Sequence, residues 1–265
     1  MKRLRLIFGA LLLGNACLLS ARAEYTEIVA KARAYLGNEE ALNAVQTIHY
    51  SGTLETIDDA GGVAKPLKLG IEIFFRKSYQ QRIVVTTEKS IETTGLDGYE
   101  AWQRQQDPAD STRWRVTLLS PDQIKRLRAN ASENLAFFQG IEKRGGSVEE
   151  QGEAEIEGIK CRKIAFIYEP TIVFVRYFDP ATGKLVLTET EQGGKIREEG
   201  EVVVKGVRFP QKIVTTNKIT NGNERVVTIS FDKVQVNETF PDDFFRVPMM
   251  WPQESKAKEP VKAAK

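Results

Sequence analysis

The stretch from Lys160 to Glu191 reads KCRKIAFIYEPTIVFVRYFDPATGKLVLTETE. It contains three runs rich in β-branched and aromatic residues, Lys160–Glu169, Ile172–Phe178 and Leu185–Glu191, and such runs are typical of strands. The second connection, Asp179-Pro180-Ala181-Thr182-Gly183, consists of turn-forming residues. Because both connections are too short for a crossover, these successive strands are predicted to run antiparallel.

Runs of the same kind extend on both sides of this stretch, with turn clusters such as Asp58-Asp59-Ala60-Gly61-Gly62 between them. Together they make about eleven or twelve strands in one series, so we expect a mainly β (α+β) fold. A sheet with so many strands tends to curl or close, which leaves a concave face for a helix to cover. The further predicted strands are Gln46–Ile57, Leu67–Phe75, Gln80–Glu88, Tyr99–Gln105, Trp114–Leu118, Val148–Glu153, Lys195–Lys205, Val207–Asn217 and Glu224–Val236.

Two helical segments precede the first strand. Apolar residues recur at helical spacing on one face of Tyr25–Leu36, and Gly37 is a natural residue to follow a helix end. Asn38 is then a good N-cap for a second, short segment that ends at Ala44. We therefore expect an N-terminal helical region ahead of the sheet.

A longer helix interrupts the strands over residues 120–139. The run Ser120-Pro121-Asp122-Gln123 places Ser at the N-cap, Pro at the first helical position and Gln at the third. An apolar stripe follows at helical spacing: Ile124, Leu127, Ala131, Leu135 and Phe138. Gly140 is a natural stop. Phe137 falls on the opposite face, so we expect this helix to contact protein on two sides.

Residues 1–23 have the pattern of a secretory signal peptide. Three basic residues precede the apolar run Leu6–Leu19, and Ala21-Arg22-Ala23 is a small-residue cleavage site. The run of about fourteen residues is too short to span a bilayer as a helix. We therefore expect export to the periplasm and cleavage after Ala23. The alternative is lipid anchoring at Cys17. Of the residues before Cys17, only Ala16 fits the pattern of a lipidation site.

The basic character of the whole chain comes from its two ends. The formal charge is +2, with 38 Lys and Arg against 36 Asp and Glu, but the leader contains four of those basic residues and no acidic one. The tail after Pro252 adds four Lys against two Glu, so the body between carries a charge of −4. A mildly acidic body does not favour nucleic acid as a partner. Residues 253–265 are predicted to be a disordered basic tail.

The inventory of reactive side chains is small. One His and two Cys cannot make a common zinc site, and Cys161 alone remains after cleavage, so no internal disulfide is expected. His49 with Ser51 is a poor hydrolase pair in a chain without a G-x-S-x-G motif. Adjacent acids such as Glu149-Glu150 and Glu198-Glu199 point to opposite faces of a strand and suit a solvated edge. We expect no catalytic residue, metal or cofactor.

Several segments, in this order and spacing, resemble the periplasmic lipoprotein-localisation (LolA/LolB-like) superfamily. They span most of residues 24–252, and each is mainly turn and strand chemistry. They are Leu36–Leu42 followed by Ile48–Gly52, Asp97–Trp102 (DGYEAW), Phe178–Lys184 (FDPATGK), Gly206–Pro210 (GVRFP), Val234–Glu238 (VQVNE) and Phe240–Pro248 (FPDDFFRVP).

The resemblance implies an incomplete β-barrel wrapped around helices, with a hydrophobic cavity that holds the acyl chains of a lipoprotein or lipid. The expected function is that of a non-enzymatic periplasmic carrier, monomeric, which ferries its cargo toward the outer membrane between delivery partners in the inner and outer membranes. The alternatives are an envelope sensor or interaction module with the same fold, and, with least support, a secreted hydrolase.

Strand alternation and the helical stripe give the candidate cavity wall. These residues are Ile73, Phe75, Ile83, Val85, Trp102, Trp114, Leu127, Leu135, Phe138, Val173 and Val175. We expect the helix over residues 120–139 to act as a lid, with Ile124, Arg128 and Phe137 as its working residues.

A known carrier of this family holds its lid closed with an arginine. Arg126, Arg128 and Arg82 are the candidates in this chain, and the alternative for each is a solvated charge. The basic run from Lys125 to Arg128 suits either anionic lipid headgroups or plain solvent.

Overall fold

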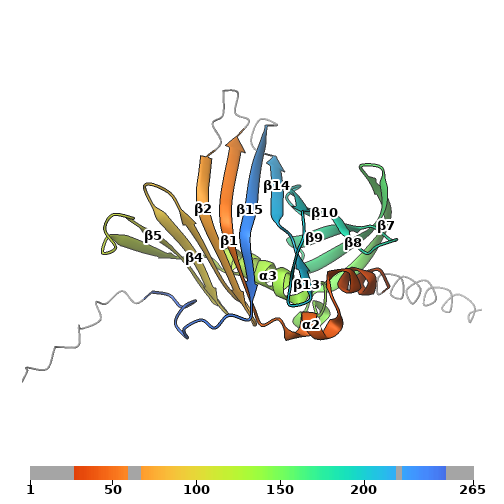
Figure 1. The fold of residues 1–265 in the computed structure, drawn as a ribbon, viewed down its shortest axis with the longest axis horizontal. Helices are drawn as coiled ribbons and strands as arrows, with labels where there is room; N and C mark the ends of the chain where they lie inside the picture. The colour runs from red at the N-terminus through yellow and green to blue at the C-terminus, as the bar shows by residue number, and fades with distance from the viewer. Residues whose placement is uncertain (1–26, 59–66, 219–222, 249–265) are drawn as a thin grey trace, which may run out of the picture.

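The structure is a computed structural model that describes residues 27–58, 67–218 and 223–248. One antiparallel sheet of 13 strands dominates it, in the order β6-β5-β4-β3-β2-β1-β15-β14-β11-β10-β9-β8-β7 (Figure 1). Its strands are β1 (Thr47–Asp58), β2 (Leu67–Arg76), β3 (Gln80–Thr86), β4 (Ile91–Asp97), β5 (Glu100–Gln106), β6 (Trp114–Leu118), β7 (Ser147–Ile156), β8 (Ile159–Glu169), β9 (Ile172–Phe178), β10 (Leu185–Thr190), β11 (Lys195–Glu199), β14 (Lys212–Lys218) and β15 (Glu224–Val236).

The sheet has two wings that meet in the middle. Strands β1 to β6 form the first wing, and β7 to β11 with β14 and β15 form the second; the antiparallel pair β1–β15 joins them. Strands β6 and β7 lie at opposite ends of the described sheet, which is therefore open and does not close into a barrel. A small separate hairpin is made by β12 (Val202–Val204) and β13 (Val207–Phe209).

Three differences from the predicted strands have local causes. Strand β4 was missed because its sequence, IETTGLD, lacks a clean alternation of apolar and polar residues. The predicted strand Lys195–Lys205 is broken after β11, where Gly200 adopts a φ of 64°. The predicted strand Val207–Asn217 is broken at Pro210, which lies between β13 and β14 and has no N–H for a ladder.

The helices begin where their caps predict. In α2 (Glu39–Ala44), the Asn38 side chain accepts a hydrogen bond from the Ala41 N–H at 2.8 Å. In α3 (Pro121–Ala136), Ser120 and Gln123 form a reciprocal capping box. The N-terminal helix covers residues 27–36 and ends before Gly37. Gly37 does not adopt the left-handed backbone conformation that is common after a helix end. A Cβ at Gly37 would lie 2.6 Å from the Gly206 carbonyl oxygen, so close backbone approach explains this glycine.

Helix α3 ends earlier than predicted, at Ala136. Phe137 and Phe138 follow with φ values of 47° and 66°, so two left-handed residues turn the chain before Gly140 is reached. The two rings consequently lie on different sides. Phe137 packs against Phe209, and Phe138 packs against Phe166. The prediction that this helix contacts protein on two sides is confirmed.

Each wing is covered by its own helix on the concave face. The apolar stripe of α3 packs against β2 to β5, in a cluster that includes Ile73, Phe75 and Leu96. The N-terminal helix places Ile28 and Ala32 against residues of β8 and β9. Figure 1 shows α3 in the middle of the molecule, between the two wings. The space between the two helices is where a site can form.

The opposite face of the first wing is covered by the segment that follows β15. Phe74 alternates with Ile73 and Phe75 on β2, so it points away from α3, and it contacts Phe240 and Phe244. The Trp102 indole Nε1–H donates to the Phe245 carbonyl at 3.1 Å. These aromatic contacts fasten the chain after β15 to the outer face of the sheet.

The proposed leader (1–23), including Cys17, and the proposed tail (253–265) lie outside the described residues. The division of the chain into a leader, a lipid-binding domain over residues 24–252 and a tail therefore stays a prediction. Within the described residues, no helix is long and apolar enough to cross a membrane.

Candidate functional site

A cavity of about 350 Å³ lies between the two covering helices and the concave face of the sheet. This volume falls in the range of small-molecule sites. One wall is apolar and is built mainly from the central strands β1, β2, β3, β14 and β15. Its residues are Tyr50, Ile73, Phe75, Ile83, Ile213, Ile229 and Phe231. Such a wall favours an apolar ligand.

The opposite wall of the cavity is polar. Arg176 on β9, Thr188 on β10 and Glu198 on β11 face the cavity, and Glu133 approaches from α3. Arg176 and Thr188 are direct cross-strand neighbours. Charged groups on one side and apolar groups on the other make this an amphipathic site.

Arg176 is the most deeply buried charge of the polar wall, with 6% of its surface exposed. Its guanidinium lies 4.6 Å from the ring centre of Phe166 and 4.8 Å from that of Phe138. Its Nη2 forms an ion pair with Glu133, whereas Nε and Nη1 have no hydrogen-bond partner. Burial lowers the pKa of Arg176 to about 9, so it remains a cation at neutral pH.

Glu198 shares this wall with Arg176. Glu198 is exposed overall and contributes to the lining of the cavity, and many protein atoms surround its carboxyl group. Burial raises the pKa of Glu198, and the charge of Arg176 only partly opposes this effect. Burial also raises the pKa of Tyr50 on the apolar wall, and the charge of Glu198 adds to it. Glu198 is therefore within electrostatic reach of both walls.

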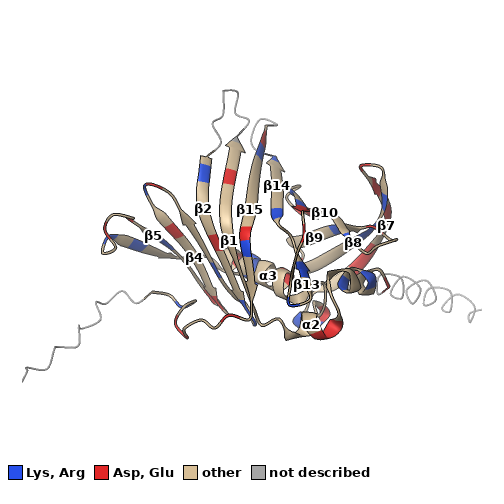
Figure 2. Cartoon of the chain, in the orientation of Figure 1, with Lys and Arg blue, Asp and Glu red and all other residues tan. Residues whose placement is uncertain are grey.

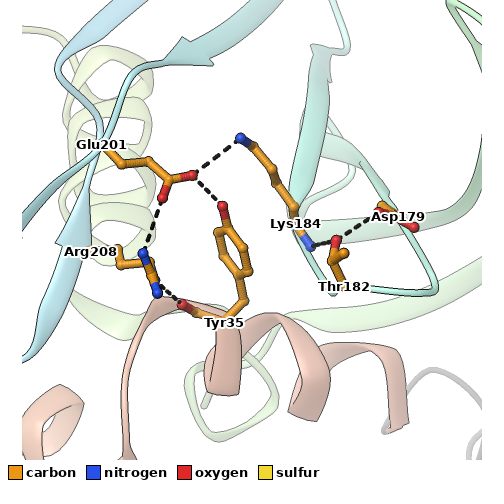
Figure 3. A network of polar contacts seen from close by, with 6 residues as sticks. All are labelled: Tyr35, Asp179, Thr182, Lys184, Glu201 and Arg208. Carbon is orange, nitrogen blue, oxygen red and sulfur yellow. Dashed lines mark hydrogen bonds and ion pairs between the residues drawn. The ribbon is translucent and has the colours of Figure 1, made fainter.

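The rim of the cavity is held by an exposed polar network (Figure 3). Glu201 accepts hydrogen bonds from the Tyr35 hydroxyl and from Lys184 Nζ, the latter at 3.1 Å. Arg208 contacts Glu201 at 3.2 Å and donates from Nε to the Tyr35 carbonyl at 2.9 Å. The network joins the N-terminal helix, the β9–β10 hairpin and the β12–β13 hairpin. Exposed ion pairs of this kind contribute roughly 0–1 kcal/mol each, so the rim is a weak tie.

Arg33 of the N-terminal helix is a functional candidate that the sequence analysis missed. Only 4% of its surface is exposed, and its Nη1 donates to the carbonyls of Ala136 (3.2 Å) and Phe137 (2.7 Å) at the end of α3. Its Nε and Nη2 bind the Glu39 carboxylate at 2.7 and 2.6 Å. The hydrogen bond from Arg33 lowers the pKa of Glu39. Arg33 thus fastens α3 to both N-terminal helices.

The basic run at the start of α3 is paired and is not a free patch. Lys125 contacts Glu169 at 2.8 Å, and Arg126 forms an ion pair with Glu191. The Arg128 guanidinium lies 3.7 Å from the ring centre of Tyr99. Positive and negative residues also alternate over both wings (Figure 2). These contacts tie the first turns of α3 to the second wing and to the β4–β5 turn.

The eleven predicted wall residues and the predicted lid residues Ile124 and Phe137 fall into three groups. Five line the cavity: Ile73, Phe75, Ile83, Phe137 and Phe138. Four others pack in or against the cluster between α3 and the first wing: Val85, Ile124, Leu127 and Leu135. The remaining four, Trp102, Trp114, Val173 and Val175, lie on the outer face, because strand register turns them away from the cavity.

The structure also revises the interpretation of Glu198 and of Arg82. Glu198 is exposed, but it lies on an inner strand of the sheet and lines the cavity, whereas Glu199 pairs with Lys212. Arg82 lies on the outer face, where its Nη1 donates to the Phe244 carbonyl at 2.9 Å, so it does not contact α3. On β9 the residues predicted for the cavity wall are Val173 and Val175, which would place Arg176 on the other face of the strand. Glu198 is predicted to face solvent because the residue is charged.

His49 lies away from the cavity. Its Nδ1 is 2.8 Å from a Glu238 oxygen, and its ring stacks on Phe74 with the centres 4.1 Å apart. The imidazole therefore helps to attach the segment after β15 to the outer face. Among the described residues, no group of three or more His, Cys, Asp or Glu side chains could hold a metal ion.

No family model matches this sequence, and no curated protein matches it. Solved structures do share its fold. A LolA superfamily protein from Nitrosomonas europaea is 12% identical over 83% of this chain and 96% of its own, with a TM-score of 0.54. A DUF1329 family protein from Desulfovibrio piger is 12% identical over 85% and 96%, with a TM-score of 0.52.

A third structure, described as a candidate outer membrane lipoprotein-sorting protein domain from Vibrio parahaemolyticus, is 11% identical over 83% of this chain and 95% of its own, with a TM-score of 0.51. At these identities the likeness concerns the fold alone. The chain has a LolA-like fold.

Proposed function

We propose that this protein is a non-enzymatic carrier that binds the acyl chains of a lipoprotein or lipid in the cavity beneath α3. The observation that carries the proposal is the apolar wall of that cavity, contributed by five strands and roofed by two helices. Each CH₂ group moved from water into such a site contributes about 0.8 kcal/mol, so binding needs no covalent chemistry. The fold shared with a LolA superfamily protein and a candidate lipoprotein-sorting domain supports this function.

The expected setting is the periplasm. The leader pattern in residues 1–23 supports export, and the direction of transport would be toward the outer membrane. A monomeric carrier of this kind takes its cargo from one membrane partner and gives it to another. The cargo chemistry is then an acylated lipoprotein or a free lipid.

Helix α3 is the proposed lid. An empty apolar cavity is costly, which favours a helix that fills the space when no ligand is bound. Arg33, which binds the last carbonyls of α3, fits the role of the arginine that holds the lid closed better than Arg126 or Arg128. Release of those carbonyls would free the end of the helix nearest the cavity.

A pair of tryptophan substitutions on β14 tests the cavity as the binding site. Ile213 lines the cavity, whereas the next residue, Val214, is half-buried on the other face of the same strand. We expect Ile213→Trp to weaken binding of a fluorescent fatty acyl probe at least tenfold, because the indole occupies the space of the chain. Val214→Trp should change the affinity less than twofold. Equal binding by wild type and Ile213→Trp would overturn the proposed site.

Native mass spectrometry of the protein isolated from the cell envelope separates the function classes. Acylated species bound to the protein would support the carrier. A lipid-free protein in complex with another protein would instead favour a sensor or interaction module. Turnover of a substrate by lipid-free protein would indicate an enzyme.

A further inference from the structure

The polar wall of the cavity is unusual for a site that holds only hydrocarbon. A purely apolar chain needs no hydrogen-bond donor, and a buried polar group without a partner is destabilising. Yet Arg176 lies in this wall with 94% of its surface covered, and its Nε and Nη1 have no partner. Donors kept in this condition point to a ligand that carries an acceptor.

The charge around Arg176 restricts that acceptor. Glu133 already forms an ion pair with Nη2, which neutralises the guanidinium. Glu198 adds a second carboxyl group to the same wall, so the three side chains together carry a charge of −1 when both acids are ionised. Protein atoms around its carboxyl group raise the pKa of Glu198, which agrees with a place where a further negative charge is disfavoured. A ligand carboxylate would add one more.

Other donors line the same cavity. Thr188, the cross-strand neighbour of Arg176, is buried and lines the cavity, and Tyr50 lines it from the apolar wall. Hydroxyl and guanidinium groups can all donate to a carbonyl oxygen. Hydrogen bonds with a charged donor are stronger than those between neutral groups, so Arg176 is the main candidate.

We propose that the wall formed by Arg176, Thr188 and Glu198 binds the uncharged carbonyl of an ester- or amide-linked acyl chain and discriminates against the carboxylate of a free fatty acid. This inference rests on the proposed function and specifies the chemical form of its cargo. The acyl chain lies on the apolar wall, and its linking carbonyl accepts from the free donors of Arg176.

The experiment compares methyl laurate with laurate at pH 8, each displacing a fluorescent acyl probe from wild-type protein. The two ligands have the same chain and differ in whether the carbonyl group is charged. We expect the ester to bind at least tenfold more tightly than the carboxylate. Equal or tighter binding of laurate would overturn the inference.

Two neighbouring glutamates provide the variant and its matched control. Glu198→Gln removes the cavity-facing charge, so we expect the preference for methyl laurate over laurate to fall about tenfold relative to wild type. Glu199→Gln removes a charge from the next residue, which pairs with Lys212 instead, and should leave both affinities unchanged. An unchanged preference in Glu198→Gln, or the same change in both variants, would overturn the inference.

Arg176→Gln tests the donor directly. We expect its affinity for methyl laurate to fall about tenfold, since the strongest donors to the carbonyl are lost. This variant leaves Glu133 unpaired and can lose stability, so the Glu198 and Glu199 variants decide the matter if it does not fold. If the acyl probe does not bind wild-type protein, or if neither methyl laurate nor laurate displaces it, the proposed function is overturned. If both ligands displace the probe equally well, only this inference is overturned.

Discussion

Arg33 illustrates how one buried side chain can fasten three helices. Its guanidinium joins Glu39 at the start of α2 to the carbonyls of Ala136 and Phe137 at the end of α3. Those carbonyls belong to the last turn, where no intrahelical donor is present. The arginine therefore takes the place of a C-cap for a helix that ends in two phenylalanines.

Substitution of Arg33 should have a large effect on stability. Arg33→Ala removes the side-chain donor to the Phe137 carbonyl and both bonds to Glu39, whereas the Ala136 carbonyl still accepts from the Gln139 N–H. A buried polar group left without a partner costs about 1–3 kcal/mol. We expect the free energy of unfolding, measured by urea denaturation, to fall by roughly 2–4 kcal/mol. Arg126→Ala, which removes an exposed ion pair, should cost less than about 1 kcal/mol. Similar losses in the two variants would contradict the role of Arg33.

At this scale the sequence predicts apolar residues better than charged ones. Ile73, Phe75 and Ile83 follow from alternation alone and do line the cavity. Arg33, Arg176 and Glu198 do not follow from alternation, because charged residues are normally assigned to solvent. Arg33 and Arg176 are in fact buried, and Glu198, although exposed, lines the cavity. Their positions depend on partners far away in the chain, such as Glu133 for Arg176.

Strand β4 and its neighbour β5 show a close fit between a glycine and an aromatic ring. Gly95 on β4 lies directly opposite Trp102 on β5. A Cβ at Gly95 would lie 2.3–2.5 Å from the atoms of the indole ring. The indole can therefore lie flat over β4 and reach the Phe245 carbonyl. The glycine that made β4 hard to recognise is needed by the contact with the segment after β15.

Replacement of this glycine should displace the tryptophan. We expect Gly95→Ala to lower the free energy of unfolding by about 1–3 kcal/mol, a typical cost of overpacking, and to shift tryptophan fluorescence to longer wavelength as the indole meets water. Gly70→Ala is the matched control, since its Cβ would meet its nearest neighbour at 3.8 Å. That variant should be neutral or slightly more stable. A neutral Gly95→Ala would contradict the close fit.

Element boundaries could be predicted where the capping chemistry is local. Ser120, Pro121 and Gln123 place the start of α3 correctly, and Asn38 places that of α2. The end of α3 could not be predicted, because Phe137 and Phe138 adopt left-handed backbone that phenylalanine rarely takes. Burial of the two rings in separate clusters stabilises that turn, and burial is a property of the tertiary structure.

The whole molecule consists of two wings with α3 fixed to both. Its apolar stripe packs on the first wing, and ion pairs tie its first turns to the loops and strands of the second. If α3 acts as the proposed lid, a ligand that enters the cavity loosens one set of these contacts. The polar set is the weaker of the two, since exposed ion pairs contribute little.

A cross-link across that weaker set should slow entry of a ligand. Lys125 and Glu169 lie in contact, so cysteines at both positions can be joined by a short thiol-reactive linker. We expect uptake of an acyl probe, followed by stopped-flow fluorescence, to slow at least tenfold after linkage. A linker between positions 55 and 68, which joins β1 to β2 without touching α3, should leave the rate unchanged. Equal rates in the two linked proteins would contradict a moving lid.

The architecture could be predicted only in outline. Short connections gave antiparallel order and a single series of strands, and the series is present as 13 strands in one sheet. The pairing of β1 with β15 could not be predicted, because no local pattern links segments so distant in sequence. That pairing decides which faces become concave, and hence which alternate residues line the cavity.

The pairing of β1 with β15 also sets the order in which this protein can assemble. Gln46, just before β1, donates to Asn237 just after β15, a contact across 191 positions of the chain. During synthesis the first wing emerges long before its partner strand and presents β1 as an unpaired edge until β15 is made. Contacts of such long range are slow to form, so docking of the two wings should limit the folding rate. Until that step β1 is an open edge through which the nascent protein can aggregate.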